Sequence, residues 1–187
     1  MLTNIIDRDR WQKLVLCLIM LTGILAGCQM PEPPLSPEAT AFKERILEII
    51  QEFSQPLVGP TAERDIKSIQ TKLEKLYRDA DQDQLPTSFT VGVLDKQGVA
   101  LTAYPDRPYN VQVFLNYHVV VKALEERRIV QARLFFQNGS KLYVICSPLL
   151  RQAELKGLLI LCFDAAEADR KWGITEEEFL ALNFNHR

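Results

Sequence analysis

The stretch YVICSPLLRQAELKGLLILCFD, residues 143–164, determines which kind of sheet this chain can form. Two apolar runs, KLYVICS (141–147) and GLLILCF (157–163), lie on either side of a nine-residue polar connection, PLLRQAELK (148–156). Both runs are apolar at nearly every position, and strands of that kind are covered on both faces of a sheet. The sequence therefore predicts two neighbouring antiparallel strands with helices or loops packed on each side.

A second pair of runs with strand character lies upstream. FTVGVL (89–94) and VALTAY (99–104) flank the turn DKQG, in which Gly98 is free to adopt a positive φ. Because such a short connection joins neighbouring antiparallel strands, the sequence predicts a hairpin here.

The run IVQARLFFQ (129–137) predicts one more strand, followed by the dipeptide NG, which is typical of a two-residue hairpin turn. In that register Arg133 lies opposite Val144, and Arg133 and Tyr143 point to opposite faces of the sheet. An arginine on a covered face needs an anion, supplied either by a side chain or by a ligand. At the edge of the sheet it would reach water instead.

Helical periodicity precedes and interrupts these strands. The Ser36 hydroxyl, with a proline at the first helical position and an acid after it, predicts a helix start. The segment QPLVGP (55–60) is expected to end this helix, and Thr61 to cap a second one. A third helix is expected within residues 113–124, and short helices close the chain. The expected buried stripes of the first two helices are Phe42, Ile46, Ile49, Ile50 and Phe53, then Ile66, Ile69, Leu73 and Leu76.

The N-terminal segment has the features of an export signal. Three basic residues precede an apolar run of about fourteen residues (14–27), shorter than the roughly 20 residues of a spanning helix. The run ends in Leu25-Ala26-Gly27-Cys28, which resembles the lipobox of bacterial lipoproteins. The resemblance implies cleavage before Cys28 and fatty acids such as palmitate attached there; a plain signal peptide or an uncleaved anchor is the alternative. The expected divisions are a lipoprotein signal peptide (1–27), a lipidated cysteine with a proline-rich tether (28–36) and a single domain (37–187).

Composition limits the classes of function. The net charge is −2 and no basic block is present, so nucleic acid is a poor partner. The two histidines, His118 and His186, lie in no catalytic motif, and neither enzymatic activity nor a cofactor is expected. Cys146 and Cys162 either form a disulfide in an oxidising compartment or stay buried as thiols. They lack companions at zinc-binding spacing, so no metal site is expected.

Taken in order, these segments resemble the Cache family, the extracytoplasmic relatives of PAS sensor domains. The likeness rests on the first helix, on VGVLDKQGVALTAYPD (91–106) and on the closing hairpin, and it covers roughly residues 36–165. It implies an α+β fold with a five-stranded antiparallel sheet in the order 2-1-5-4-3. N-terminal helices would cover one face, and a helix and a loop would cover a pocket on the other.

The resemblance also implies a sensory function. Cache domains bind small extracellular molecules such as organic acids, amino acids or amines, and they usually continue through a membrane helix into a signalling module. This chain has no second apolar segment before Arg187. We therefore expect a lipoprotein anchored in the membrane, facing the periplasm or cell exterior, that reports its ligand to a membrane receptor or kinase. The alternative is a structural or assembly lipoprotein that uses the fold as a docking platform without a ligand.

The expected pocket lies between the loop YPDRPYN (104–110), the third helix and the sheet. Arg107 could bind a carboxylate through two charge-assisted hydrogen bonds, and a solvated loop arginine is the alternative, which the loop context favours. Tyr117 lies on the apolar stripe of its helix and serves the core first, and His118 lies one position off that stripe. The candidate ligand-binding residues are Tyr104, Arg107, Tyr109, Asn116, Tyr117, Arg133 and Tyr143.

Overall fold

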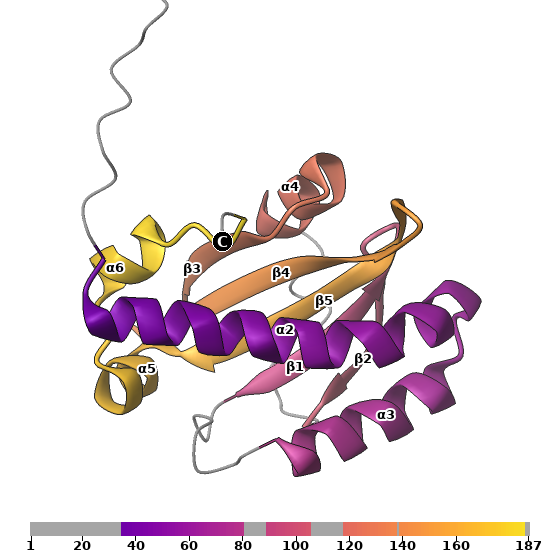
Figure 1. Cartoon of the computed structure of the whole chain (residues 1–187), viewed down its shortest axis with the longest axis horizontal. Helices are drawn as coiled ribbons and strands as arrows, with labels where there is room; N and C mark the ends of the chain where they lie inside the picture. Colours follow the sequence, from indigo (N-terminus) through magenta and orange to yellow (C-terminus); the bar gives the residue numbers. More distant parts are fainter. Residues whose placement is uncertain (1–34, 81–88, 106–117, 138, 186–187) are drawn as a thin grey trace, which may run out of the picture. The chain divides into compact units, whose positions relative to one another are not determined.

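The structure, a computed structural model, describes residues 35–80, 89–105, 118–137 and 139–185 (Figure 1). Its elements follow one another in the predicted order. The strands are β1 (Thr90–Asp95), β2 (Ala100–Tyr104), β3 (Val130–Phe135), β4 (Lys141–Arg151) and β5 (Glu154–Asp164). The helices are α2 (Pro37–Glu63), α3 (Ile66–Asp79), α4 (His118–Glu126), α5 (Ala165–Trp172) and α6 (Glu176–Ala181).

The strands form one antiparallel sheet in the order β2-β1-β5-β4-β3, which confirms the predicted topology. β5 lies at the centre, with β1 along one edge and β4 along the other. Helices pack on both faces of this central strand, which explains why the run GLLILCF is apolar throughout.

The predicted nine-residue connection 148–156 is wrong. β4 and β5 stay paired to the end of their hairpin, and Gln152 and Ala153 alone form the turn, with φ of 52° and 65°. Two central residues with positive φ are typical of the turn that suits twisted strands. Pro148 is tolerated inside β4 because β3 begins opposite Cys146, so the part of β4 beyond Cys146 pairs with β5 alone.

The two-residue turn predicted between β3 and β4 is also wrong, by one residue. The Phe136 amide donates to the Ser140 carbonyl at 3.0 Å, and Gly139 has a φ of 82°. The loop therefore spans three residues, and the register pairs Arg133 with Tyr143. Because a slip of one residue moves a whole strand's side chains to the other face, Arg133 and Tyr143 share a face.

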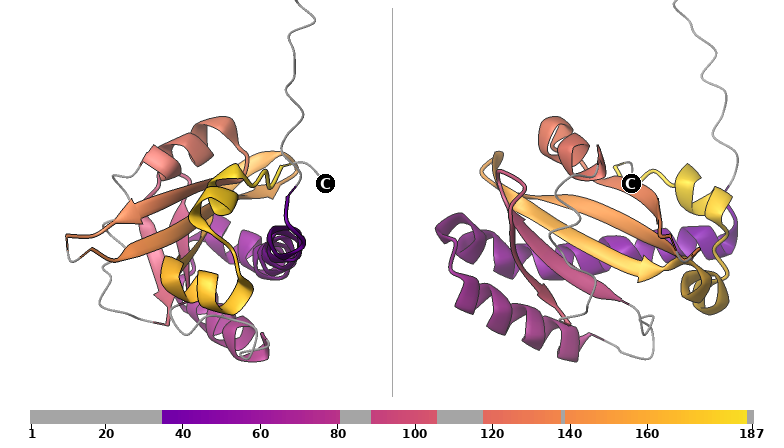
Figure 2. Two further views of the ribbon diagram at one scale, coloured as in Figure 1. Left: turned by 90° about the vertical axis from the view of Figure 1, so that its left-hand side faces the viewer. Right: turned by 180° about the vertical axis from the view of Figure 1, so that it is seen from behind.

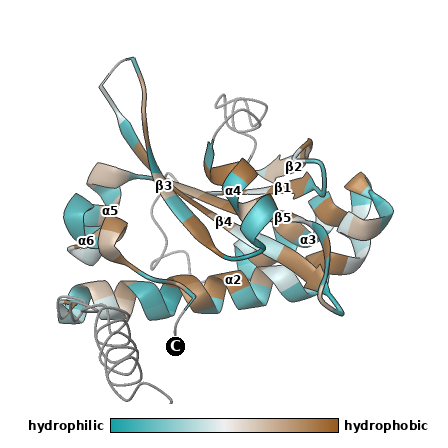
Figure 3. Cartoon of the chain, turned by 90° about the horizontal axis from the view of Figure 1, so that it is seen from above, coloured by the Kyte–Doolittle hydropathy of each residue, from teal (hydrophilic) through white to brown (hydrophobic). Residues whose placement is uncertain are grey.

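Helices cover both faces of the sheet (Figure 2). α2, α3, α5 and α6 lie on one face, over the larger core cluster, which includes Phe42, Phe89 and Phe163. α4 lies on the other face, over a smaller cluster that includes Val120 and Ile160. In Figure 3 the central strands are largely hydrophobic, whereas hydrophilic residues are frequent on α5 and α6. Both faces are therefore covered, as predicted.

α2 does not end at residues 55–60 but continues to Glu63. Leu57 and Thr61 extend its buried stripe, and this burial offsets the hydrogen bonds that the two prolines cannot donate. Consequently Thr61 belongs to α2, and Asp65 caps α3 instead, accepting a hydrogen bond from the Ser68 amide at 3.1 Å.

The closing helices are attached to the beginning of α2. Thr175 and Glu178 form a capping box at the start of α6. The Ser36 hydroxyl, which belongs to the N-cap of α2, donates to Glu178 Oε1 at 2.5 Å. The pKa of Glu178 is lowered, because hydrogen bonds from Ser36 and then from Thr175 favour its charged form.

Glu178→Gln is expected to reduce stability near neutral pH and to lose this effect in acid. The pKa of Glu178 is lower in the folded state, so its contribution is present above the ordinary glutamate pKa and is lost as pH falls through the folded value. Urea unfolding from pH 7 down to acid, compared with wild type, measures the effect. Glu177→Gln, which removes an equal charge from the same helical turn, is the control. An equal response of both variants would contradict the prediction.

The C-terminal segment covers part of the outer edge of β3. Asn185 donates through Nδ2 to the Ile129 carbonyl at 3.0 Å and accepts through Oδ1 from the Ile129 amide at 2.9 Å. The Gln131 side chain donates to the Leu182 carbonyl. The backbone of Ile129, next to the start of this edge strand, is therefore satisfied by Asn185, 56 positions away in sequence.

Candidate functional site

The face under α4 carries a cluster of buried side chains over the part of the chain that is described. Cys146 and Cys162 lie here as free, buried thiols, and burial raises the pKa of Cys146 to about 12. The loop and helix residues that would complete the predicted pocket, residues 106–117, lie outside the described residues, so that pocket stays a prediction. The buried residues of this face are Leu94, Val119, Val120, Ala123, Val130, Leu134, Leu142, Val144, Cys146, Leu158, Ile160 and Cys162.

A hollow of about 540 Å³ lies at the tip of the hairpin formed by β3 and β4. The tip of that hairpin forms one wall, the first turns of α5 form another, and the connection from α5 to α6 forms a third. Figure 2 (left) shows these elements at the same end of the sheet. The lining residues are Gly139, Ser140, Lys141, Tyr143, Asp164, Ala165, Ala166, Asp169, Ile174, Thr175 and Glu176.

Tyr143 is the aromatic residue of this hollow. Its ring stacks on Phe179 with 3.9 Å between centroids and packs edge-on against Phe163. The side chain is 2% exposed and lines the hollow. Desolvation, and secondarily the negative charge of Asp169, raises the pKa of Tyr143, so the phenol is neutral at ordinary pH.

Glu176 organises the hairpin wall. Its carboxylate forms an ion pair with Arg133 and a second one with Lys141, whose Nζ lies 2.8 Å from Oε2. The Arg133 guanidinium also lies over the Phe135 ring, 4.2 Å from its centroid. The two bases that face this side of the hollow are therefore already bound to a carboxylate.

The α5 wall is acidic. Asp164 caps the helix, accepting hydrogen bonds from the amides of Ala166 and Glu167 at 2.9 and 3.1 Å. Asp169 lies farther along the same helix, lines the hollow, and forms no ion pair within the described residues. The hollow is thus lined by both the Asp169 carboxylate and the Tyr143 side chain.

The structure brings two of the seven candidate residues to this place. Tyr143 lines the hollow, and Arg133 reaches its wall through Glu176. Tyr104 lies away from it, on the α3 side of the sheet, where its ring meets Tyr77 edge-on at 5.2 Å. The other four candidates, Arg107, Tyr109, Asn116 and Tyr117, lie outside the described residues, as does Cys28.

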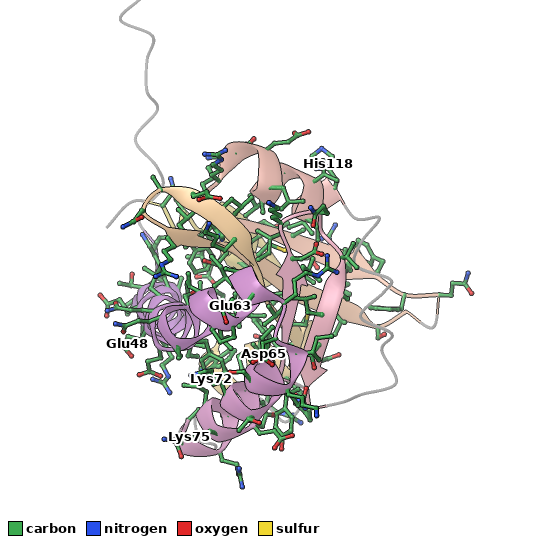
Figure 4. All side chains as sticks on the ribbon, turned by 90° about the vertical axis from the view of Figure 1, so that its right-hand side faces the viewer. Glu48, Glu63, Asp65, Lys72, Lys75 and His118 are labelled. Atoms are coloured by element: carbon green, nitrogen blue, oxygen red, sulfur yellow. The ribbon has the colours of Figure 1, made fainter. Side chains whose placement is uncertain are left out.

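His118 begins α4 and is exposed. Figure 4 places it on the opposite side of the sheet from Lys72 and Lys75, which project outward from α3.

Sequence analysis missed Asp169 and Glu176. Neither lies in a motif, and each meets its partners from an element far along the chain: Glu176 lies 43 positions after Arg133. The available signal was the pair of helix caps, Asp164 and Thr175, which indicates two short helix starts following the last strand.

A smaller hollow of about 140 Å³ lies at the other end of α2. Buried Asp95 borders it, but its Oδ1 accepts hydrogen bonds from the amides of Gln97 and Val99, both at 2.9 Å, and its Oδ2 pairs with Arg64 at 3.1 Å. Asp95 therefore holds the β1–β2 turn, and the larger hollow is the candidate site.

The fold can now be compared with known structures. A domain from Vibrio parahaemolyticus, of a protein assigned to the sensory box/GGDEF family, superposes with a TM-score of 0.53 at 13% identity, over 75% of this chain and 60% of the other. The chain has a Cache-like fold. This Cache-like domain spans less than two thirds of the matched Vibrio chain.

Two weaker likenesses carry no weight in this assignment. The extracellular domain of a protein assigned as a histidine kinase matches at 16% identity and a TM-score of 0.49, over 73% of this chain and 58% of the other. The sensor domain of the V. cholerae histidine kinase DctB matches at 14% identity and 0.39, over 73% and 61%. No protein-family model matches the chain, and no curated protein matches it.

The described residues offer neither a membrane span nor a metal centre. None of their helices is both long enough and apolar enough to cross a bilayer. Among the same residues, no three potential metal ligands converge.

Proposed function

We propose that this Cache-like domain is a sensory module that binds a small molecule outside the cytoplasmic membrane and reports it to a partner protein, such as a membrane receptor or kinase. The observation that supports this best is the hollow of about 540 Å³ at the hairpin tip, which Tyr143 lines together with polar residues of α5 and of the α5–α6 connection. A concave site that combines an aromatic side chain with a few polar groups is typical of small-molecule binding.

The second part of the proposal is a lipid anchor at Cys28. The lipobox-like sequence supports it. The hydrogen bond from Ser36 to Glu178 ties the start of α2 to α6, so it determines where a tether would meet the domain. A tether from Cys28 to Ser36 would join the domain beside α6, close to the hollow. Ligand binding and the anchor would then act on the same end of the domain.

A ligand screen tests the sensory proposal. The full-length chain, purified in detergent, is heated in the presence of small carboxylates, amines and neutral polar compounds. A ligand at 100 times its dissociation constant should add about 2.7 kcal/mol of stability. Stabilisation by at least one compound, lost or reduced in a variant of the hollow, is the expected result. If every compound leaves the melting temperature unchanged, the docking-platform alternative is favoured. Intact-mass analysis with Cys28→Ser as control measures the lipid.

A further inference from the structure

We propose that the free part of the β3 edge is an interface for a second copy of this chain. The second copy adds its own β3 antiparallel to the first, across a two-fold axis, so that the two sheets become continuous. This inference concerns the edge of the sheet and does not depend on the ligand proposed above.

The backbone of β3 leaves this edge open. β3 pairs with β4 alone, and in an antiparallel pair every second residue directs its N–H and C=O groups away from the neighbouring strand. The Ile129 groups point outward, because Asn185 binds both of them. The Phe136 N–H points inward, because it donates to the Ser140 carbonyl. By this alternation, three residues direct unpaired backbone groups outward within the described part of the chain: Gln131, Arg133 and Phe135.

The open part of the edge is accessible and carries no net charge that would repel a second strand. It lies on the part of the hairpin that projects beyond the helices (Figure 2, left). Its charged residue, Arg133, is neutralised by the ion pair with Glu176. Phe135 beside it is 59% exposed, and an exposed apolar side chain on an unpaired edge favours association with another strand.

One register satisfies both copies on the face that carries Arg133. Asn185 blocks any register in which Phe135 would meet Ile129 of the second copy. A register that placed Arg133 opposite Arg133 would set like charges against each other. The next register places Arg133 opposite Phe135 of the second copy, and the reverse. The guanidinium, 4.2 Å from the centroid of its own Phe135 ring, would then contact a second ring.

The same register also matches the side chains on the α4 face. Leu134 lies opposite Leu134 of the second copy, and Ala132 lies opposite Phe136, so a small side chain faces a large one. All three residues belong to the apolar cluster under α4 or pack against it, and this cluster would continue across the axis. Because each copy uses its own β3 edge on the other, the pair is closed and no free β3 edge remains.

Disulfide cross-linking of the full-length chain in detergent tests the register. In Leu134→Cys the two new thiols lie directly opposite each other in a non-hydrogen-bonded pair, where the Cα atoms are close enough for a disulfide. Oxidation with copper(II) phenanthroline should convert most of this variant into a covalent dimer. Ala132→Cys is the matched control on the same strand and face. Its two thiols lie four residues apart, roughly 13 Å along the strands, so it should remain monomeric, as wild type does.

Sedimentation equilibrium in density-matched detergent tests the Arg133 contact. We expect the wild-type dimer to have a dissociation constant of about 0.1 mM or lower. Phe135→Lys and Phe135→Glu both remove the exposed ring, but lysine would face Arg133 of the second copy and glutamate would pair with it. Because the two-fold axis repeats the contact, the lysine variant should associate at least about 10-fold more weakly than the glutamate variant.

Three results would overturn the inference: a wild-type chain that is monomeric at about 1 mM, cross-linking of Ala132→Cys as readily as Leu134→Cys, or equal association of the two Phe135 variants. Melting temperatures show whether each variant folds. If Leu134→Cys does not fold, the Phe135 variants decide, since that side chain is exposed. A monomeric chain that still binds a compound in the ligand screen would keep the sensory proposal and remove this one.

Discussion

Gly157→Ala is expected to destabilise the domain by about 3 kcal/mol or more. Gly157 lies in the central strand β5, opposite Asp95 of β1. A Cβ added there would lie 2.3 Å from the Leu94 carbonyl oxygen and 2.6 Å from Cγ2 of Thr61 on α2. Neither neighbour can yield cheaply, because one is backbone of a paired strand and the other is a buried, branched side chain.

Equilibrium unfolding in urea measures this effect, and Gly59→Ala is the matched control. A Cβ at Gly59 would meet nothing within 4 Å, and the residue lies inside α2 without a positive φ. Alanine there should be neutral or stabilise the domain by up to about 1 kcal/mol. Equal stability of the two variants would show that α2 does not approach β5 as closely as described.

Phe163→Ala should cost about 3–5 kcal/mol. The Phe163 ring is fully buried and contacts a ring of α2, a ring of α5 and a ring of α6 as well as Tyr143 of the adjacent strand. Its removal leaves a cavity where four elements meet, and it also withdraws one support of the Tyr143 ring. Urea unfolding gives the loss in stability, and near-ultraviolet circular dichroism reports the aromatic packing.

Phe135→Ala is the control for Phe163. Phe135 is 59% exposed on β3, and its ring contacts the Arg133 guanidinium and the Lys141 ammonium. Removing it should change stability by about 1 kcal/mol or less. A similar loss for the two phenylalanines would contradict the assignment of Phe163 to the centre of the core.

The fold could be predicted because it depends on local patterns that allow few solutions. Two uninterrupted apolar runs required a sheet covered on both faces, and the short turn at Gly98 required a hairpin. The resemblance to Cache domains then supplied the strand order, which the sheet confirms. The prediction of the covered sheet, the hairpin and the strand order does not change if the end of a strand is misplaced by one or two residues.

The site could not be predicted, because it depends on such small differences. An Asn-Gly pair fits both a two-residue and a three-residue loop, yet only the longer loop brings Arg133 and Tyr143 to the same face. In the same way, two prolines suggested a helix end at residues 55–60, and burial of Leu57 prevailed over them. The ion pairs of Glu176 could not be predicted, because Arg133 and Lys141 come close to it only in the folded chain.

The two hydrogen bonds between Asn185 and Ile129 affect self-association of the protein. An edge strand with unpaired backbone N–H and C=O groups can pair with a strand of a second chain, and this pairing leads to aggregation. The Asn185 side-chain amide bonds both the N–H and the C=O of Ile129, so these two backbone groups cannot pair with another strand. Asn185 thereby blocks strand addition by a second copy of the protein at the start of β3.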